Sequence, residues 1–431
     1  MTTFIESGPV FRPGDAGYDA HRAGWQRAFE SRPALIVAAA RPDDVRKAVL
    51  TARERALPFA VQATGHGTLA PADGGLLLKT TALDSVAIDP ARRVARVGPG
   101  ALWAGVNRAA ARFGLAGLAG RCGTVGVTGY TLGGGQSWLS RTFGFAADSV
   151  VSADVVTADG TALTVSADQH PDLFWALRGG GGNFGVVTSL EFRLYPVRRV
   201  FSGMSFYPAD RAPRALAAYR EWAPTEPEAM NTAVLLLREP SSGRRLLAIR
   251  AFHVGDDGRR VLAPLLEAAG PPLHDAYGMR SFPDASEATN GPDAPPMAIR
   301  QEIEFFRTLP GDLLETIAAP DSSLGFVELR HWGGAMARPG PDAGPAGHRD
   351  VPYSVMAVAP DPAGAGALDR LFARLRPHAT GGSFLTLLTD PSRTRSAFTP
   401  ANYARLARLK RLWDPGNFFH IGHNIPPEVI P

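Results

Sequence analysis

The first hundred residues alternate between short apolar runs and polar turns. Apolar runs at residues 34–39 and 59–63 flank a segment in which Val45, Val49 and Ala52 recur at helical spacing. Acidic residues directly after Pro42 suit the positive end of such a helix. This pattern predicts a strand–helix–strand unit. Further short strands are expected at residues 76–79, 86–89 and 94–97, followed by a helix at residues 102–113.

Residues 154–165 alternate around Asp159-Gly160, which predicts a hairpin, and a short helix at residues 171–178 precedes a strand at residues 185–194. After about residue 200, short apolar strands alternate with amphipathic helices and with Pro/Gly-rich insertions, of which residues 339–347 are one. This texture predicts an antiparallel sheet with helices on one face. Strands are expected at residues 233–237, 246–252, 326–330, 353–358 and 384–388, and helices at residues 259–269, 368–376 and 402–413.

Length and composition narrow the class of protein. A chain of 431 residues with 45% hydrophobic residues suits two domains better than one core. The net charge of +4 is small, and no cluster of basic and aromatic residues predicts nucleic-acid binding. The single cysteine excludes an intrachain disulfide. We found no leader pattern and no apolar run of membrane length, so we expect a cytoplasmic protein without a membrane partner.

The only cysteine, Cys122, lies in the glycine-rich stretch GRCGTVGVTGYTLGGG at residues 120–135. Glycines recur there every three residues from Gly120 to Gly129, and such density lets a backbone turn sharply or approach a ligand closely. A lone cysteine often serves only as a small hydrophobic residue. The surrounding glycines favour a loop that contacts a flat or anionic cofactor instead.

A second glycine turn, Thr64 to Thr68, follows a predicted strand and contains His66. Consecutive backbone N–H groups in such a turn can cradle a pyrophosphate, although a histidine there can also serve only as a hydrogen-bonding residue. Gly180, Gly182 and Gly185 match the pattern G-x-G-x-x-G, but a helix precedes them and a strand follows. This order is the reverse of the nicotinamide-binding fingerprint, so we exclude that fold.

Six motifs together resemble the berberine-bridge-enzyme-like flavoprotein oxidases of the vanillyl-alcohol-oxidase superfamily. The resemblance covers nearly the whole chain. It implies a PCMH-type FAD-binding domain at residues 1–198, an antiparallel-sheet substrate domain covered by helices at residues 199–397, and a C-terminal segment at residues 398–431 that returns to the first domain. The motifs are PGDAGYD (13–19), TGHG (64–67), GRCGTVGVTGYTLGGGQ (120–136), WALRGGGGNFGVV (175–187), ELRHWGGAM (328–336) and DPGNFFHIGHNIPP (414–427).

The resemblance implies FAD held by two covalent bonds, from His66 to the 8α-methyl carbon and from Cys122 to ring carbon 6. Both side chains are nucleophiles that can add to an electron-poor ring. Val125 implies reaction with oxygen, although simple loop packing is the alternative. No metal is expected. The noncovalent FAD contacts implied are Thr64, Gly65, Gly67 and Thr68 at the pyrophosphate, Gly123, Thr124, Val125, Gly126, Gly129 and Gly133 along the ring and ribityl chain, Gly185 and Val187 near the adenine, and Asn417 at the flavin.

The family's catalytic tyrosine is missing from residues 383–388, which correspond to the strand that usually carries it. Alternation along a strand points Glu328 and Arg330 to the same face, so Glu328 is a candidate base, unless the two form an ordinary structural ion pair. Tyr353 and Tyr130 are further candidates.

The sequence therefore predicts an α+β, two-domain FAD oxidase. We expect it to remove a hydride from an alcohol, an amine or an activated C–H of a small molecule and to reduce molecular oxygen to hydrogen peroxide. The substrate face reads as largely apolar, which favours a bulky secondary metabolite. A monomer or homodimer is expected. Two alternatives stay open: a flavoprotein that assists a cyclisation without net redox turnover, and a dehydrogenase with another electron acceptor.

Overall fold

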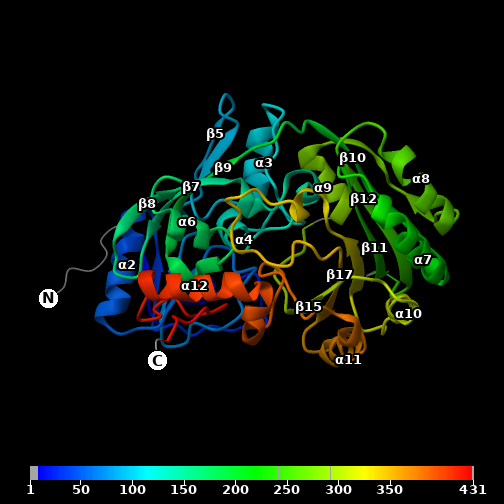
Figure 1. The fold of residues 1–431 in the computed structure, drawn as a ribbon. Helices are drawn as coiled ribbons and strands as arrows, with labels where there is room; N and C mark the ends of the chain where they lie inside the picture. Colours follow the sequence, from blue (N-terminus) through cyan, green and yellow to red (C-terminus); the bar gives the residue numbers. More distant parts are fainter. Residues whose placement is uncertain (1–7, 240–241, 292, 430–431) are drawn as a thin grey trace.

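The computed structural model describes residues 8–239, 242–291 and 293–429. Two lobes lie side by side, the first built from the N-terminal half of the chain and the second from residues after β9 (Figure 1). In the first lobe, β2 (Leu35–Ala38), β4 (Leu76–Lys79) and β3 (Phe59–Gln62) are parallel neighbours, and β1 (Val10–Phe11) pairs with β2. Helix α2 (Pro42–Glu54) makes the crossover and buries Val45, Val49 and Ala52, which confirms the predicted strand–helix–strand unit.

A second sheet of this lobe has the strand order β5-β6-β9-β7-β8. It contains the predicted hairpin; α3 (Trp103–Ala111) connects β6 to the glycine-rich stretch, and α4 (Val127–Leu132) lies within that stretch. The structure also confirms the predicted strands at residues 76–79, 86–89 and 94–97. The bounds are β5 (Val86–Asp89), β6 (Val94–Val97), β7 (Val150–Val156), β8 (Ala162–Ser166), β9 (Val186–Arg193) and the short helix α6 (Pro171–Leu177).

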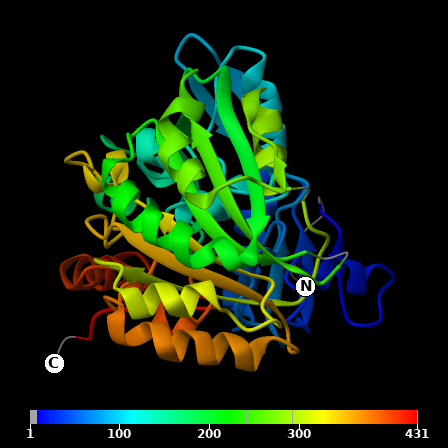
Figure 2. The same ribbon diagram turned by 90° about the vertical axis from the view of Figure 1, so that its right-hand side faces the viewer.

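The second lobe is built on an antiparallel sheet with the strand order β13-β10-β12-β11-β16-β17-β15, with β14 beside β10. Helices cover its outer face, as Figure 2 shows, and its inner face is turned toward the first lobe. The strands are β10 (Arg199–Pro208), β11 (Met230–Arg238), β12 (Arg245–His253), β13 (His274–Asp275), β14 (Gly278–Ser281), β15 (Ile299–Phe306), β16 (Phe326–His331) and β17 (Tyr353–Pro360), and the covering helices are α7 (Ala212–Trp222), α8 (Gly258–Ala269), α10 (Gly311–Ala318) and α11 (Ala365–Leu375).

Alternation along these strands divides their side chains between two hydrophobic cores. Val327, Leu329 and Val355 pack toward the helices, whereas Ala233 and Phe252 join a core that continues into the first lobe as far as Trp103. The α+β class and the antiparallel, helix-covered sheet are therefore as predicted. One predicted strand is wrong.

Residues 384–388 form a turn instead of a strand. The backbone carbonyl groups of this segment are taken by side chains from elsewhere: Gln301 donates to Leu387 O at 2.7 Å and His423 bonds Leu388 O at 2.9 Å. The side chain of Thr386 accepts the Gly135 N–H at 3.0 Å. The segment therefore packs against the glycine-rich stretch and leaves β15 as the last strand in the order described.

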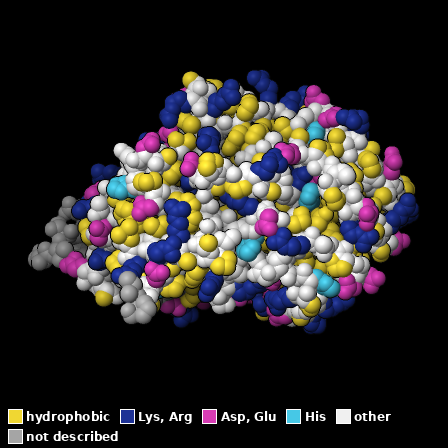
Figure 3. All heavy atoms as spheres, viewed as in Figure 1, with side chains coloured by type: hydrophobic (Ala, Val, Ile, Leu, Met, Phe, Trp, Pro, Cys, Tyr) yellow, Lys and Arg dark blue, Asp and Glu magenta, His cyan; other side chains and the backbone are white. Residues whose placement is uncertain are grey.

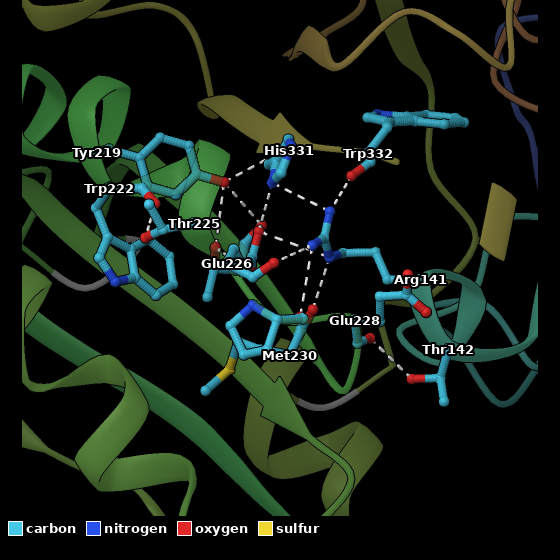
Figure 4. Close-up of polar contacts among 12 residues, drawn as sticks. Arg141, Thr142, Tyr219, Trp222, Thr225, Glu226, Glu228, Met230, His331 and Trp332 are labelled. Atoms are coloured by element: carbon cyan, nitrogen blue, oxygen red, sulfur yellow. Dashed lines mark hydrogen bonds and ion pairs between the residues drawn. The ribbon is translucent and has the colours of Figure 1, made fainter. Parts of the chain in front are cut away.

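A buried arginine connects the lobes. Arg141, in α5 (Ser140–Phe143) of the first lobe, donates to the backbone oxygens of Met230 and Glu226 at 2.7 Å each and also to Trp332 O (Figure 4). The Glu226 carboxylate lies 3.7 Å from Arg141 Nε and 2.7 Å from His331 Nδ1. Nδ1 of His331 cannot both accept a hydrogen bond from Arg141 and donate one to Glu226. The charged carboxylate is the better partner, so the ring hydrogen is assigned to Nδ1.

The C-terminal helix α12 (Pro400–Trp413), seen in red in Figure 1, lies along the first lobe. Its buried Lys410 donates to Asn183 O and Phe419 O at 2.8 Å each and to the Asp414 carboxylate at 2.6 Å. A buried ammonium group needs such partners. These bonds bring the DPGNFFHIGHNIPP block back to the glycine-rich turn before β9.

The surface and the helices bear on possible partners. On the face in Figure 3, basic and acidic side chains are interspersed without a continuous basic patch. Within the described ranges, no helix combines the length and the apolar character needed to cross a bilayer.

Candidate functional site

The turn at Thr64 to Thr68 positions His66 directly after the carboxyl end of β3. The ring of Trp25 stacks on the imidazole with 4.6 Å between centroids and 14° between planes. Nδ1 of His66 is 2.9 Å from Thr64 Oγ1, and Nε2 is buried without a partner in the structure. Burial lowers the pKa of His66 to about 4, although the nearby Asp293 carboxylate opposes this shift. His66 is therefore a neutral imidazole with one free nitrogen.

The loop that carries Cys122 is held from the second lobe by α9 (Phe282–Asn290) and the segment after it. Asp293 accepts the Gly123 and Thr124 N–H groups at 3.1 Å each, and Asn290 donates to Arg121 O at 3.1 Å. The half-buried Cys122 thiol is hydrogen-bonded to the same Asp293 carboxylate. Burial and Asp293 raise the pKa of Cys122, against the effect of Arg121. The raised pKa favours the thiol form of Cys122, with the Asp293 carboxylate beside it.

His66 and Cys122 lie on loops that face one another. A Cβ added at Gly126 would lie 3.7 Å from the Thr64 side chain, and Asp293 acts on the pKa of both His66 and Cys122. A cleft of about 490 Å³ lies here, within the size range of ligand sites. Its lining includes Trp25, Arg27, Thr64, His66, Thr124, Asp293 and Pro295.

The residues present fit a large polar cofactor such as FAD. Buried polar atoms without partners in the described structure include His66 Nε2, Thr128 Oγ1, Tyr130 OH and Asn424 Oδ1. A Cβ at Gly67 or Gly129 would meet no atom within 4 Å, so open space lies over both glycines. Unpaired buried polar groups are costly, and a cofactor rich in oxygen and nitrogen would satisfy them.

The other expected cofactor residues have more varied positions. Thr68 accepts a hydrogen bond from Gln62, and Gly65, with a φ of 77°, packs against Gly24. A Cβ at Gly133 would lie 2.8 Å from Thr386 Oγ1. Gly185 and Val187 contact β7, where a Cβ at Gly185 would lie 2.4 Å from a Val155 methyl group. Their approach to the adenine stays a prediction.

The structure places Asn417 and His66 at different clefts. Asn417 lines its cleft together with the end of α2 and with Pro58. Pro58 precedes β3, whereas His66 comes after the other end of β3. Asn417 adopts a left-handed φ of 52°, which asparagine tolerates in a turn. Asn417 Oδ1 and Asn424 Oδ1 of the same block are both buried without a partner in the described structure, so contact of Asn417 with the flavin stays a prediction.

The inner face of the substrate sheet carries a buried cluster of charges among apolar side chains such as Ala233 and Phe252. Glu328 and Arg330 do share a face, with 3.1 Å between Oε1 and Nε. The other Glu328 oxygen lies 3.2 Å from Arg250 Nη1 and also pairs with Arg121. Burial alone would raise the pKa of Glu328, but the three arginines lower it to about 2. A carboxylate of that pKa is a poor proton acceptor, so the structure favours the ion-pair alternative.

The two candidate tyrosines differ in position. Tyr353 lies on the helix-covered face of the sheet, opposite to Glu328 and Arg330, and is wrong as a catalytic residue. Tyr130 lies in α4 with its hydroxyl buried and without a partner, and Arg330 acts on it electrostatically. Burial raises the pKa of Tyr130 well above 10. Tyr130 therefore stays a candidate contact but a poor base.

Sequence reasoning missed Trp25, Asp293, Arg250 and Asn231. Trp25 and Asp293 lie in stretches without periodic pattern, so nothing local marked them. Arg250 sits inside an apolar run, LLAIRAFH, and a charge at an inward-facing strand position was the available signal.

Comparison with known proteins agrees with this site. A family model described as an FAD binding domain matches residues 33–166, and one described as berberine and berberine like matches residues 382–426. The chain is 31% identical to (R)-6-hydroxynicotine oxidase of Paenarthrobacter nicotinovorans, over 98% of this chain and 97% of that protein. An FAD-linked oxidoreductase of Dictyostelium discoideum is 28% identical over 99% and 97%.

Solved structures agree as well. The crystal structure of 6-hydroxy-D-nicotine oxidase from Arthrobacter nicotinovorans superposes with a TM-score of 0.88, at 29% identity and 98% of both chains. Berberine bridge enzyme from Eschscholzia californica gives 0.85 at 22% identity, over 99% of this chain and 98% of that one, which supports the fold alone. The chain therefore belongs to the berberine-bridge-enzyme-like FAD-linked oxidoreductases of the PCMH-type fold and is an FAD-dependent enzyme.

Proposed function

We propose that this enzyme is an oxidase that carries FAD on two covalent bonds, to His66 and to Cys122. It takes a hydride from a carbon of a small molecule and passes the electrons to molecular oxygen, which gives hydrogen peroxide. The observation that carries the proposal is the pair of facing loops: His66 offers a free, neutral nitrogen and Cys122 a thiol beside a carboxylate. A cytoplasmic location and a role in secondary metabolism are part of the same proposal.

Each side chain has a separate task. Bound FAD supplies the hydride acceptor. Thr64 keeps Nδ1 of His66 engaged, so that Nε2 is the attacking nitrogen. Asp293 holds the loop of Cys122 through the Gly123 and Thr124 N–H groups, and the thiolate is the reactive form of that side chain. The N–H groups of the turn at Thr64 to Thr68 are those that would hold the cofactor's phosphates.

An amine is the substrate class that best suits a site whose candidate residues are poor proton acceptors. Removing a hydride from an alcohol also requires a base for the hydroxyl proton, whereas a neutral amine can lose a hydride and leave an iminium ion. Glu328, with its pKa of about 2, and Tyr130, with its raised pKa, are both unsuited to accept that proton. A relative named as a 6-hydroxynicotine oxidase acts on a nitrogen-containing small molecule, which agrees with this choice.

Denaturation tests the two bonds. The purified protein is precipitated with acid, and the flavin absorbance of the pellet is compared with that of the supernatant. We expect the unaltered protein to keep its flavin in the pellet, Cys122→Ala and His66→Ala each to keep one bond, and the double variant to release it. Flavin found only in the supernatant of the unaltered protein would contradict the double attachment.

Anaerobic reduction tests the reaction. A panel of amines is mixed with the enzyme without oxygen, and the flavin absorbance is followed before and after air is admitted. Bleaching with fast recovery supports the oxidase, and Val125→Leu is expected to slow the recovery alone. No bleaching with any amine or alcohol favours the flavoprotein without net redox turnover, and bleaching without fast recovery favours the dehydrogenase.

A further inference from the structure

Two arginines flank a single alanine on the inner face of the substrate sheet. In the strand registers, Ala233 of β11 pairs with Arg250 of β12 on one side and with Arg330 of β16 on the other. Side chains directly opposite one another on one face of a sheet are close neighbours. The Glu328 carboxylate bridges the two guanidinium groups, with Oε2 3.2 Å from Arg250 Nη1 and Oε1 3.1 Å from Arg330 Nε.

The charges of this cluster do not balance within the described part of the chain. Arg121, Arg250 and Arg330 all pair with one carboxylate, that of Glu328. Arg250 and Arg330 are 7% and 3% exposed, so water does little to stabilise them. Burial lowers the pKa of Arg250 to about 9 and of Arg330 to about 10, values at which both remain cationic at neutral pH. A buried excess of positive charge is costly unless an anion accompanies it.

Free hydrogen-bond donors point to the same conclusion. Arg250 Nε, Arg330 Nη2, Asn231 Nδ2 and Gln136 Nε2 are buried without partners in the structure. Asn231 precedes Ala233 by two residues and therefore shares its face. An acceptor with several lone pairs and a negative charge would satisfy these donors together, and a carboxylate has this chemistry.

An apolar wall adjoins the donors. The Arg330 guanidinium lies 3.9 Å from the centre of the Trp138 ring. The Phe252 ring stacks on Trp138 with 6.4 Å between the ring centroids. Arg250 also interacts electrostatically with Cys122, one of the proposed flavin attachments. Arg121, which precedes Cys122 in the chain, pairs with Glu328, so the cluster adjoins the loop of this proposed attachment.

We propose that Arg250 and Arg330 bind a carboxylate group of the substrate, so that this enzyme acts on an anionic or zwitterionic amine. The proposal rests on the proposed function for the amine, but the carboxylate site itself does not require turnover. Glu328 orients the two guanidinium groups by bridging them, and the substrate carboxylate accepts from the N–H groups that Glu328 leaves free.

Equilibrium dialysis of the holoenzyme tests the site with benzoate and its neutral isostere benzamide. Benzoate is expected to bind at least tenfold more tightly than benzamide, and Arg250→Gln and Arg330→Gln each to weaken benzoate at least tenfold. Arg300→Gln, an exposed arginine paired with Asp369 in the same lobe, is the matched control and should leave both affinities unchanged.

A third variant covers the case in which an arginine variant fails to fold. Glu328→Gln keeps the shape and an acceptor oxygen but removes the negative charge, so benzoate should bind several-fold more tightly. No benzoate binding, equal binding of benzamide, or unchanged benzoate binding in folded arginine variants would each overturn the proposal. A shifted flavin midpoint potential with unchanged benzoate binding would assign the arginines to the flavin and overturn it too. Because dialysis needs no turnover, failure of the oxidase proposal would leave these results interpretable.

Discussion

Replacing Arg141 by methionine should destabilise the protein by about 3–5 kcal/mol, the usual cost of breaking a buried ion pair. The substitution removes donors from three backbone oxygens, those of Met230, Glu226 and Trp332, and leaves the Glu226 carboxylate, which is fully buried, with only His331 and Thr232. Hydrogen bonds to charged groups contribute about 1.5–3 kcal/mol each, so the estimate does not depend on any single bond.

The second variant separates the charge from the packing. Adding Glu226→Gln to Arg141→Met removes the stranded buried charge, so the double variant should recover at least about 1 kcal/mol relative to additivity. Urea unfolding of the holoprotein, followed by tryptophan fluorescence and far-ultraviolet circular dichroism, measures the midpoints and slopes. The control Arg300→Gln, which breaks an exposed pair, should change stability by less than about 0.5 kcal/mol. An Arg141→Met variant as stable as this control would refute the reasoning.

Three other predictions follow from the site. The stability of the apoprotein should fall as the pH is lowered from 6.5 to 4. In that range His66 takes up a proton in the unfolded chain but not in the folded chain, where the pKa of His66 is about 4. His66→Gln should show a shallower fall in urea unfolding across that window, and parallel slopes would contradict this origin. Gly129→Leu should lower the flavin content without lowering the melting temperature of the apoprotein, because open space lies over Gly129. Gly135→Ala should lower that melting temperature, because the φ of Gly135 is 71° and a Cβ there would lie 2.5 Å from Tyr130. Equal flavin content in Gly129→Leu would move the flavin away from α4. Asp293→Asn, which leaves the Gly123 or the Thr124 N–H group without its carboxylate acceptor, should reduce the bond at Cys122 while His66 remains attached, and the masses of the Cys122-containing and His66-containing peptides measure both.

The sequence pattern predicted the first lobe well because its helices and strands are determined by residues that are close together in the chain. Val45, Val49 and Ala52 mark a helix whatever surrounds them, and the strand at residues 76–79 is buried on all four positions. Alternation also placed Glu328 and Arg330 on one face correctly. The predicted strand at residues 384–388 was wrong for a reason that no local pattern contains: Gln301 and His423, distant in sequence, occupy its carbonyl groups.

The candidate site shows the same difference between features set by local sequence and features set by long-range contacts. Glycine density and the isolated cysteine located the two loops, and the resemblance to a family supplied their chemistry. The charge on Glu328 was predicted less well, because Arg121 reaches it from a loop of the other lobe and Arg250 from β12, which is separated from β16 by β11. Asp293 was missed because its bonds to the Gly123 and Thr124 N–H groups are tertiary contacts across 170 and 169 positions.

The cover formed by α9 and Asp293 has a consequence for biosynthesis. Both attachment loops are complete once residue 135 has been translated, but α9 and Asp293, which hold the Cys122 loop, emerge about 150 residues later. At cellular translation speeds of about 5–20 residues per second, this leaves an interval of about 7–30 s. During that interval the contacts of α9 and Asp293 with the Cys122 loop do not yet exist, so a flavin that binds then does not have to displace them.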